Sequence, residues 1–321
     1  MGRFGDRAMM TRRQLLASFA VARAARAAQD QETVFRVDVR LVRILATVKT
    51  ASGELVGNLQ KEDFSIFDNG VPQQIAVFEH HTEQPLSIAI LIDTSSSTGI
   101  ELRYEVESVT RFLRALFSSG NPQDAVELYS FDADTTLLAP FTRRLDRLER
   151  ELKALKGTGG TSLYDAICFA AESLEKREGR HVLVVITDGG DTTSAKTFHQ
   201  ALEAAHMTDA VIYPILVMPI TNDPGRNVGG ENALTLMAQG TGGRVFAPSL
   251  GPALDQAFTD ILRDLRTQYL LGYYPKDVPP SKERFHRLQI KVNRPDLRVL
   301  ARSGYYETSE ENRGWKSVRE E

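Results

Sequence analysis

The sequence predicts an α/β protein with a doubly wound, mainly parallel sheet and a smaller β-sandwich built from N- and C-terminal segments. Residues 84–268 alternate strand-like apolar runs with amphipathic helical runs, a rhythm that places helices on both faces of a parallel sheet. Two of these runs, 86–93 and 181–187, are almost unbroken apolar stretches, as in strands buried on both faces. The flanks, 34–83 and 269–306, are rich in strand-like runs. Each flank is marginal alone, so we expect the two to pair.

The first 28 residues have the composition of an export signal. Arg12 and Arg13 precede a short apolar stretch at 15–22, and the sequence Ala-Arg-Ala-Ala at 25–28 is suited to cleavage by a signal peptidase. The paired arginines favour the twin-arginine route. A general secretory signal and a basic amphipathic helix of a cytoplasmic protein remain as alternatives. Because the apolar stretch is too short to span a bilayer, we expect an exported periplasmic or extracellular protein without a transmembrane segment.

The N-terminal flank predicts a strand over 34–48 and a hairpin over 64–78, because Asn69-Gly70 separates two strand-like runs. In the central segment, in chain order, strands are predicted at 86–93, 125–131, 135–140, 181–187, 210–217 and 243–246, and helices at 99–117, 145–155, 163–174, 195–206, 232–238 and 252–266.

The C-terminal flank predicts strands at 269–274, 285–292 and 297–304, and residues 307–321 read as a charged, disordered tail. The single cysteine, Cys168, excludes a disulfide within the chain. It lies in a helical apolar pattern, which indicates a buried small side chain rather than a nucleophile. The formal net charge of −3 comes without a basic stripe, so composition argues against nucleic acid as a partner.

Oxygen-bearing side chains follow two of the predicted buried strands. Asp93-x-Ser95-x-Ser97 ends the first, and Asp188 ends the run 181–187. The carboxyl ends of parallel strands meet at one rim of the sheet, where α/β proteins bind ligands. Thr161, at the start of a predicted helix, reaches the same rim. Hard oxygen donors of this kind suit a hard cation such as Mg²⁺.

These three pieces, Asp93-x-Ser95-x-Ser97, Gly-Gly-Thr161-Ser and Ile-Thr-Asp188-Gly, resemble the metal-ion-dependent adhesion site of von Willebrand factor A-type domains, in the order that the family has them. The β-rich flanks, with Tyr-Leu-Leu-Gly-Tyr-Tyr-Pro at 269–275, make residues 34–306 similar to the VWFA-related Acidobacterial domain subfamily. Ser96 stands where the family often has a small residue such as glycine.

The resemblance implies a ligand set for a divalent cation, first of all Mg²⁺, with Mn²⁺ or Ca²⁺ as alternatives. Ser95 and Ser97 would contact the ion directly, Asp93 and Thr161 directly or through water, and Asp188 mostly through water. The ion would take up an Asp or Glu carboxylate from a protein partner. Three neighbours of this set are candidates for orienting it, although helix capping explains them equally well: Thr94, Asp165 and Asp191.

We therefore expect a metal-dependent protein-binding module of the cell envelope or exterior, and not an enzyme. One alternative is a structural or assembly component whose ion only stabilises loops. Another is a metal-assisted hydrolase, against which the sequence offers no convincing general base, since His181, His199 and His206 are not tied to the motif. The glycine-rich loop at 156–162 lacks the Gly-Lys-Thr ending of a phosphate loop, so no nucleotide is expected.

Overall fold

The computed structural model describes most of the chain. The described residues are 41–80, 84–95, 102–157, 159–217, 228–279, 281 and 283–307. Five predictions fall wholly or partly outside these ranges: the export signal at 1–28, the beginning of the strand predicted at 34–48, the ligand Ser97, the first residues of the helix predicted at 99–117 and the tail beyond Glu307. Within the described ranges, no helix is both long and apolar enough to cross a membrane.

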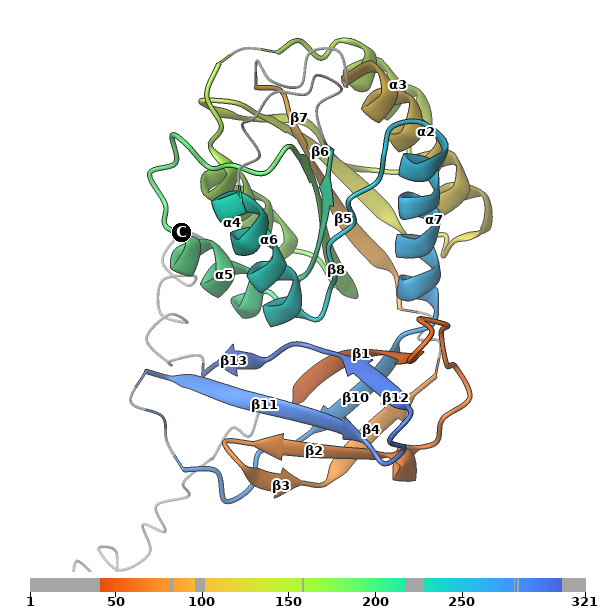
Figure 1. The fold of residues 1–321 in the computed structure, drawn as a ribbon, viewed down its shortest axis with the longest axis vertical. Coiled ribbons are helices and arrows are strands. Elements are labelled where there is room, and N and C mark those ends of the chain that lie inside the picture. Colours follow the sequence, from red (N-terminus) through yellow and green to blue (C-terminus); the bar gives the residue numbers. More distant parts are fainter. Residues whose placement is uncertain are drawn as a thin grey trace, which may run out of the picture. The chain divides into compact units, whose positions relative to one another are not determined.

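The predicted mainly parallel sheet is confirmed (Figure 1). Its strands are β5 (Leu86–Asp93), β6 (Ala125–Phe131), β7 (Thr135–Thr142), β8 (Arg180–Thr187) and β9 (Val211–Leu216). They lie in the order β7-β6-β5-β8-β9. Strands β6, β5, β8 and β9 are parallel, whereas β7 pairs with β6 in the antiparallel direction. The strand that carries the Asp93 motif therefore lies in the middle of the sheet.

Helices cover both faces of this sheet (Figure 1). One face is covered by α2 (Leu102–Ser119), α3 (Leu145–Lys153) and α7 (Pro252–Arg266), and the other by α4 (Leu163–Leu174), α5 (Phe198–Met207) and α6 (Val228–Thr241). Side chains of β5 alternate between the two cores: Ile90 packs with α2, α3 and α7, and Leu91 packs with α4, α5 and α6. Every residue of β5 is buried, which explains its unbroken apolar sequence.

Two four-stranded antiparallel sheets form the predicted β-sandwich, and each contains strands from both ends of the chain. Their orders are β12-β1-β10-β4 and β13-β11-β2-β3. The strands are β1 (Val42–Thr50), β2 (Phe64–Asp68), β3 (Val71–Gln73), β4 (Ile75–Glu79), β10 (Tyr269–Tyr273), β11 (Phe285–Val292), β12 (Leu297–Leu300) and β13 (Gly304–Tyr306), with the short helix η1 (Lys61–Asp63) before β2. The predicted Asn69-Gly70 hairpin joins β2 to β3, and both residues have positive φ angles, 48° and 84°.

A buried carboxylate ties the two sheets of the sandwich together. Asp68, which is 0% exposed, accepts hydrogen bonds from the hydroxyls of Tyr273 (2.7 Å) and Tyr305 (2.9 Å). Its other oxygen lies 3.0 Å from Nδ1 of His286. Tyr273 belongs to one sheet, and Asp68, His286 and Tyr305 belong to the other. Pairing of the N- and C-terminal flanks is thus fixed by side chains as well as by strand hydrogen bonds.

Ionic contacts join the sandwich to the α/β part. Lys49 of β1 lies 2.8 Å from the buried carboxylate of Asp264 on α7, which also receives Arg244 at 2.8 Å. Arg302, between β12 and β13, donates to the carboxylate of Asp209 and to a backbone carbonyl of β1. Burying such groups is favourable only when they are paired, so these contacts fix specific residues opposite one another.

Several boundaries differ from the predictions; α6, for example, covers Val228–Thr241 rather than 232–238. Helix α5 begins at Phe198 rather than 195, because the N–H groups of residues 195 and 196 donate to Asp165, and Thr197 then caps the helix. The second arm of the hairpin predicted over 64–78 is split at Gln74 into β3 and β4, which belong to different sheets. The strand predicted at 297–304 is likewise divided into β12 and β13. At 243–246 only a single bridge forms, between Phe246 and Ile215.

Candidate functional site

The candidate site lies where β5 and β8 end. The two strands pair in parallel, with Ile92 opposite Ile186, so that the next residues, Asp93 and Thr187, lie side by side. The Thr187 hydroxyl donates a hydrogen bond of 2.6 Å to Oδ2 of Asp93, and both residues are 0% exposed. Sequence reasoning missed Thr187, because a threonine at the end of an apolar run also reads as ordinary strand sequence.

The Asp93 carboxylate is held by hydrogen bonds in a buried setting. Its Oδ1 accepts the Ser95 backbone N–H at 2.9 Å, which closes a tight turn after the strand. Burial raises the pKa of Asp93 to about 6 against the hydrogen bonds from Thr187 and Ser95, which lower it, and the charge of Asp188 raises it further. Burial dominates because the charged form loses its hydration. A positive charge close to Asp93 would stabilise its charged form.

Thr161 is positioned by the loop that follows β8. Its N–H donates to the Thr192 hydroxyl at 2.9 Å, and its carbonyl accepts the N–H groups of Thr192 (2.8 Å) and Thr193 (3.2 Å). Ser162, the N-cap of α4, donates its hydroxyl to the carbonyl of Ala133 at 2.7 Å, and its N–H to that of Asp132. The backbone of residues 161–162 is thus bonded to the segments that follow β6 and β8. Thr161 is 6% exposed.

Asp188 follows Thr187 and is half-buried. Its charge contributes to the raised pKa of Asp93, which places the two carboxylates near one another. The following residue, Gly189, has a φ of +113°, a conformation that side-chain-bearing residues rarely adopt. A Cβ atom on Gly230 of α6 would lie only 1.2 Å from the Gly189 carbonyl. The close packing of α6 therefore fixes the turn that carries Asp188.

Thr94, Asp165 and Asp191, the predicted neighbours of the metal ligands, form hydrogen bonds within the protein. Thr94 donates its N–H (2.9 Å) and its hydroxyl (3.3 Å) to the carbonyl of Phe131. Asp165 accepts two N–H groups of the loop before α5, at 2.8 and 2.9 Å. Asp191 accepts the Ser194 hydroxyl and, at 3.3 Å, the N–H of Tyr164 at the start of α4. These bonds hold the loops around the rim in place.

The donor chemistry of the rim fits a hard divalent cation. Asp93, Ser95, Thr161 and Asp188 offer carboxylate and hydroxyl oxygens, the donors that Mg²⁺ prefers. Ser97, the fifth predicted ligand, lies outside the described residues. Among the residues that the structure describes, no cluster of three or more His, Cys, Asp or Glu side chains is suited to a metal. A metal site on this rim would therefore use hydroxyl oxygens as well as carboxylates, and it would include Ser97, which lies outside the described residues.

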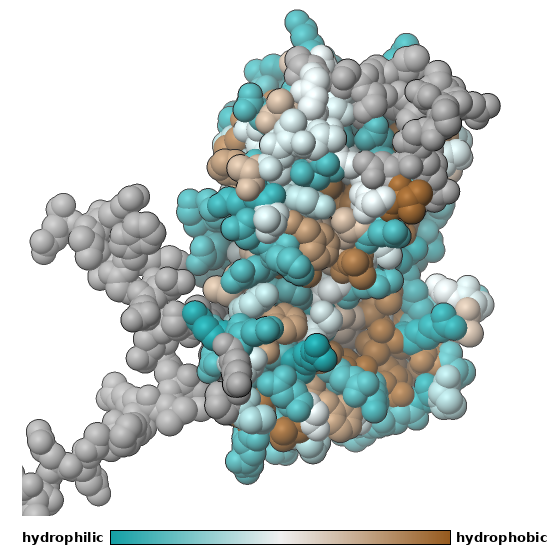
Figure 2. Space-filling view, turned by 60° about the vertical axis from the view of Figure 1, so that its left-hand side comes forward, coloured by the Kyte–Doolittle hydropathy of each residue, from teal (hydrophilic) through white to brown (hydrophobic). Residues whose placement is uncertain are grey.

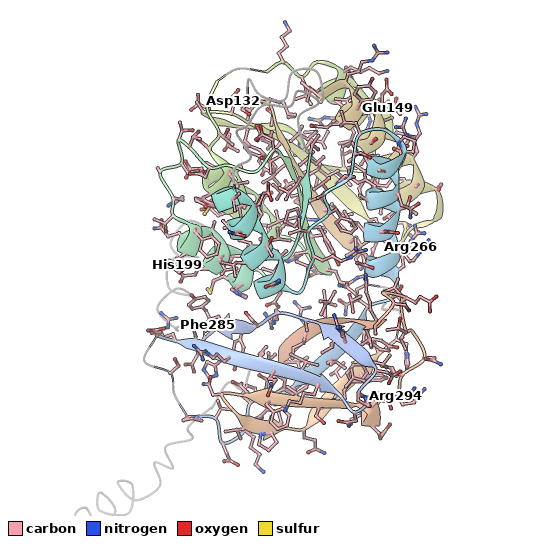
Figure 3. The ribbon with its side chains drawn as sticks, viewed as in Figure 1. Asp132, Glu149, His199, Arg266, Phe285 and Arg294 are labelled. Carbon is pink, nitrogen blue, oxygen red and sulfur yellow. The ribbon has the colours of Figure 1, made fainter. Side chains whose placement is uncertain are left out.

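The histidines named in the sequence analysis lie in settings of their own. Both ring nitrogens of His181 face backbone carbonyls, of Thr208 at 2.6 Å and of Arg177 at 3.1 Å. His206 is buried, and burial lowers its pKa to about 4. His199 is exposed on α5, where Figure 3 labels it.

Comparison with known proteins assigns the central segment. Residues 88–190 match the family model of the von Willebrand factor type A domain, and this stretch contains Asp93, Ser95, Thr161 and Asp188. Residues 88–190 accordingly belong to a von Willebrand factor type A domain. None of the curated proteins compared with the chain matches it.

Several solved structures resemble the chain. BatB from Bacteroides thetaiotaomicron is 19% identical, with 56% of this chain and 98% of that chain covered and a TM-score of 0.45. The vWF domain of the type V pili tip protein Mfa5 from Porphyromonas gingivalis is 16% identical, with 56% and 94% covered and a TM-score of 0.47. The PilB minor pilin from Streptococcus sanguinis is 14% identical, with 58% and 62% covered and a TM-score of 0.45.

Proposed function

We propose that this chain is a metal-dependent protein-binding module of the cell envelope or exterior. A divalent cation, first of all Mg²⁺, would be held at the rim by Asp93, Ser95, Ser97, Thr161 and Asp188, and it would supply a positive charge that an Asp or Glu carboxylate of a partner protein can bind. The observation that carries the proposal is the buried Asp93 carboxylate, oriented by Thr187 and Ser95 at the end of the central strand, within a von Willebrand factor type A domain.

The residues of the chain have separate tasks in this proposal. Thr187 and the Ser95 N–H orient the Asp93 carboxylate by hydrogen bonds to its two oxygens. The bonds between Thr161 and the 192–193 segment hold the threonine at the same rim. Few anionic ligands would contact the ion directly, which leaves it attractive to an external carboxylate. Export, with residues 1–28 as the signal, belongs to the same proposal.

A second candidate is a structural role for the same site. The hydrogen bonds from Thr187 to Asp93 and from the 192–193 segment to Thr161 link the loops of the rim directly through protein atoms. In that case an ion would add stability to the loops without recruiting a partner. Chelation would then lower the melting temperature, whereas in the binding module chelation would release the partner and leave the melting temperature nearly unchanged.

Calorimetric titration of the purified chain with Mg²⁺, Mn²⁺ and Ca²⁺ tests the proposal. We expect one saturable site, lost in Asp93→Ala and weakened in Thr161→Ala. Asp146→Ala is the matched control, because it removes an exposed carboxylate from α3. Equal metal binding by the wild-type chain and Asp93→Ala would contradict the assignment. Absence of any metal binding by the wild-type chain would favour a scaffold in which the motif holds no ion.

A further inference from the structure

A groove runs between α2 and α3, on the face of the parallel sheet that α7 also covers. It has a volume of about 590 Å³, within the range of roughly 300–1,000 Å³ that is usual for ligand pockets. α2 and α3 lie together on one face of the parallel sheet, and α2 follows the strand that carries Asp93 (Figure 1). Figure 3 labels Glu149 of α3, which lines the groove, and Asp132 after β6; both lie at the end of the molecule where β6 ends.

The floor and the walls of the groove differ in chemistry. Apolar side chains from both helices line it, namely Leu102, Val106, Leu152 and Leu155. The charged lining consists of Arg103, Arg111, Arg114 and Lys153, with Glu107 and Glu149 as the anions. The lining therefore has two more cationic than anionic side chains, in a chain whose formal net charge is −3. An apolar floor with cationic walls suits a segment that has apolar and acidic residues.

The cations of the wall are available to a partner. Arg103 pairs with Glu107, Arg114 with Glu149, and Arg111 with Asp255 of α7. The arginine side chains in these pairs are 50% to 85% exposed. Exposed ion pairs contribute little stability, so a partner carboxylate can compete for the arginines.

Lys153 is exposed and has no ion pair with any residue that the structure describes. It therefore offers a positive charge that no carboxylate of the described residues neutralises. Because Lys153 stands on α3 and the arginines stand on α2, both walls of the groove carry positive charge.

The other side of the domain has a different surface. Figure 2 views the side of α4, α5 and α6, where brown apolar residues lie among teal hydrophilic ones. Large exposed apolar side chains on these helices include Phe169 and Leu236, neither of which lines the α2–α3 groove. The α2–α3 groove thus combines concavity, apolar floor and positive charge at one place.

We propose that the α2–α3 groove docks an acidic amphipathic segment of the protein whose carboxylate binds at the metal rim. This inference rests on the proposed function and extends it, because it assigns a chemistry to the partner beyond a single Asp or Glu. The groove and the rim are close in the sequence: Ser95 and Leu102 are seven residues apart, which is at most about 25 Å of extended chain. The partner's apolar residues pack against Val106 and Leu155, and its acidic residues face Lys153 and the arginines.

A designed peptide pair tests the groove. The probe is a labelled, acetylated helical peptide with an N-terminal Asp, a stripe of Leu on one face and Glu on the flanks; in the control peptide Lys replaces every Glu. Fluorescence anisotropy with the full chain in Mg²⁺ is expected to give saturable binding of the acidic peptide, and at least about tenfold weaker binding of the Lys peptide. Equal binding of both peptides, or no binding of the acidic one up to about 1 mM, overturns the proposal.

Variants of the chain locate the binding. Lys153→Glu is expected to weaken the acidic peptide about threefold to tenfold, and Thr110→Trp, which fills the groove, is expected to abolish its binding. Lys176→Glu is the matched control, since it makes the same charge change at an exposed lysine outside the lining. If Lys153→Glu and Lys176→Glu weaken binding equally, net charge explains the effect and the groove assignment fails.

The same variants separate this inference from the proposed function. Lys153→Glu and Thr110→Trp are expected to keep the metal affinity of the wild-type chain in calorimetry, and Asp93→Ala is expected to lose it. Peptide binding that persists in EDTA and in Asp93→Ala, yet is lost in Thr110→Trp, would retain the groove and reject a shared metal contact. Metal binding without peptide binding would retain the metal site and reject the groove.

Discussion

The buried histidine on α5 makes the stability of the folded chain sensitive to acid. His206 is 4% exposed, and burial lowers its pKa from 6.5 to about 4; the nearby positive charge of Arg302 acts in the same direction, whereas Asp209 and a backbone bond to Gly304 oppose it. The folded chain therefore keeps this imidazole neutral at pH values where the unfolded chain protonates it. Proton uptake by the unfolded state favours unfolding.

The sign and size of the effect follow from the two pKa values. The contribution of neutral His206 to stability is complete above the unfolded pKa of 6.5 and is lost as the pH falls towards the folded pKa of about 4. Linkage then gives a loss of about 3 kcal/mol between neutral pH and about pH 4. For a domain of ordinary stability, about 5–15 kcal/mol, this loss is large.

Other buried groups titrate in the same range with the opposite sign. Burial raises the pKa of Glu127 to about 7 and that of Asp93 to about 6, so both favour the folded state as the pH falls. The stability curve of the wild-type chain alone therefore does not isolate His206. The difference between the wild-type chain and His206→Gln does, because Glu127 and Asp93 are present in both.

The assay is equilibrium unfolding in urea, followed by far-ultraviolet circular dichroism from about pH 7 to about pH 4. The stability of His206→Gln relative to the wild-type chain is expected to rise by about 3 kcal/mol over this range. The control is His199→Gln, an exposed histidine on the same helix (Figure 3). Parallel curves for the wild-type chain and His206→Gln would refute the reasoning, even if the variant is less stable at every pH.

Two further substitutions test the rim and the sandwich. Thr187→Val keeps the shape of the side chain but removes the hydroxyl that donates to Asp93. The Mg²⁺ affinity measured by calorimetry is expected to fall about tenfold. An unchanged affinity would show that this hydrogen bond does not orient the carboxylate. Tyr273→Phe removes one of the two tyrosine hydroxyls that donate to the buried Asp68. The free energy of unfolding, measured in urea, is expected to fall by about 1.5–3 kcal/mol. A loss near zero would show that Tyr305 compensates.

The sequence was sufficient to predict elements whose burial is complete. β5 and β6 have the predicted bounds, and β8 differs by one residue, because a strand buried on both faces must be apolar throughout and ends where polar residues begin. The same logic placed Asp93 and Asp188 at the ends of neighbouring strands, since parallel strands end at one rim. These predictions needed only the local pattern and the rule for strand direction.

Features that depend on distant contacts were not predictable. The hairpin arm breaks at Gln74 beside Gln73, whose amide exchanges hydrogen bonds with the backbone of Lys276, at 2.9 and 3.0 Å, more than 200 residues away. The late start of α5 depends on Asp165 from another helix. The role of Thr187 depends on the register between β5 and β8. None of these partners is visible in a local window of sequence.

The composition of the rim bears on how metal and partner would be linked. Its two carboxylates, Asp93 and Asp188, lie close enough for one to raise the pKa of the other, so an additional carboxylate from a partner would meet repulsion from both. A divalent cation would reverse this, because it would offset the charge of the pair, and the hydroxyls of Ser95 and Thr161 would be neutral donors to it. If the cation strengthens the binding of a carboxylate-bearing partner by some factor, the partner must strengthen the binding of the cation by the same factor. Weak affinity for Mg²⁺ in the isolated chain is therefore compatible with tight binding in the complex, and the two affinities need to be measured together.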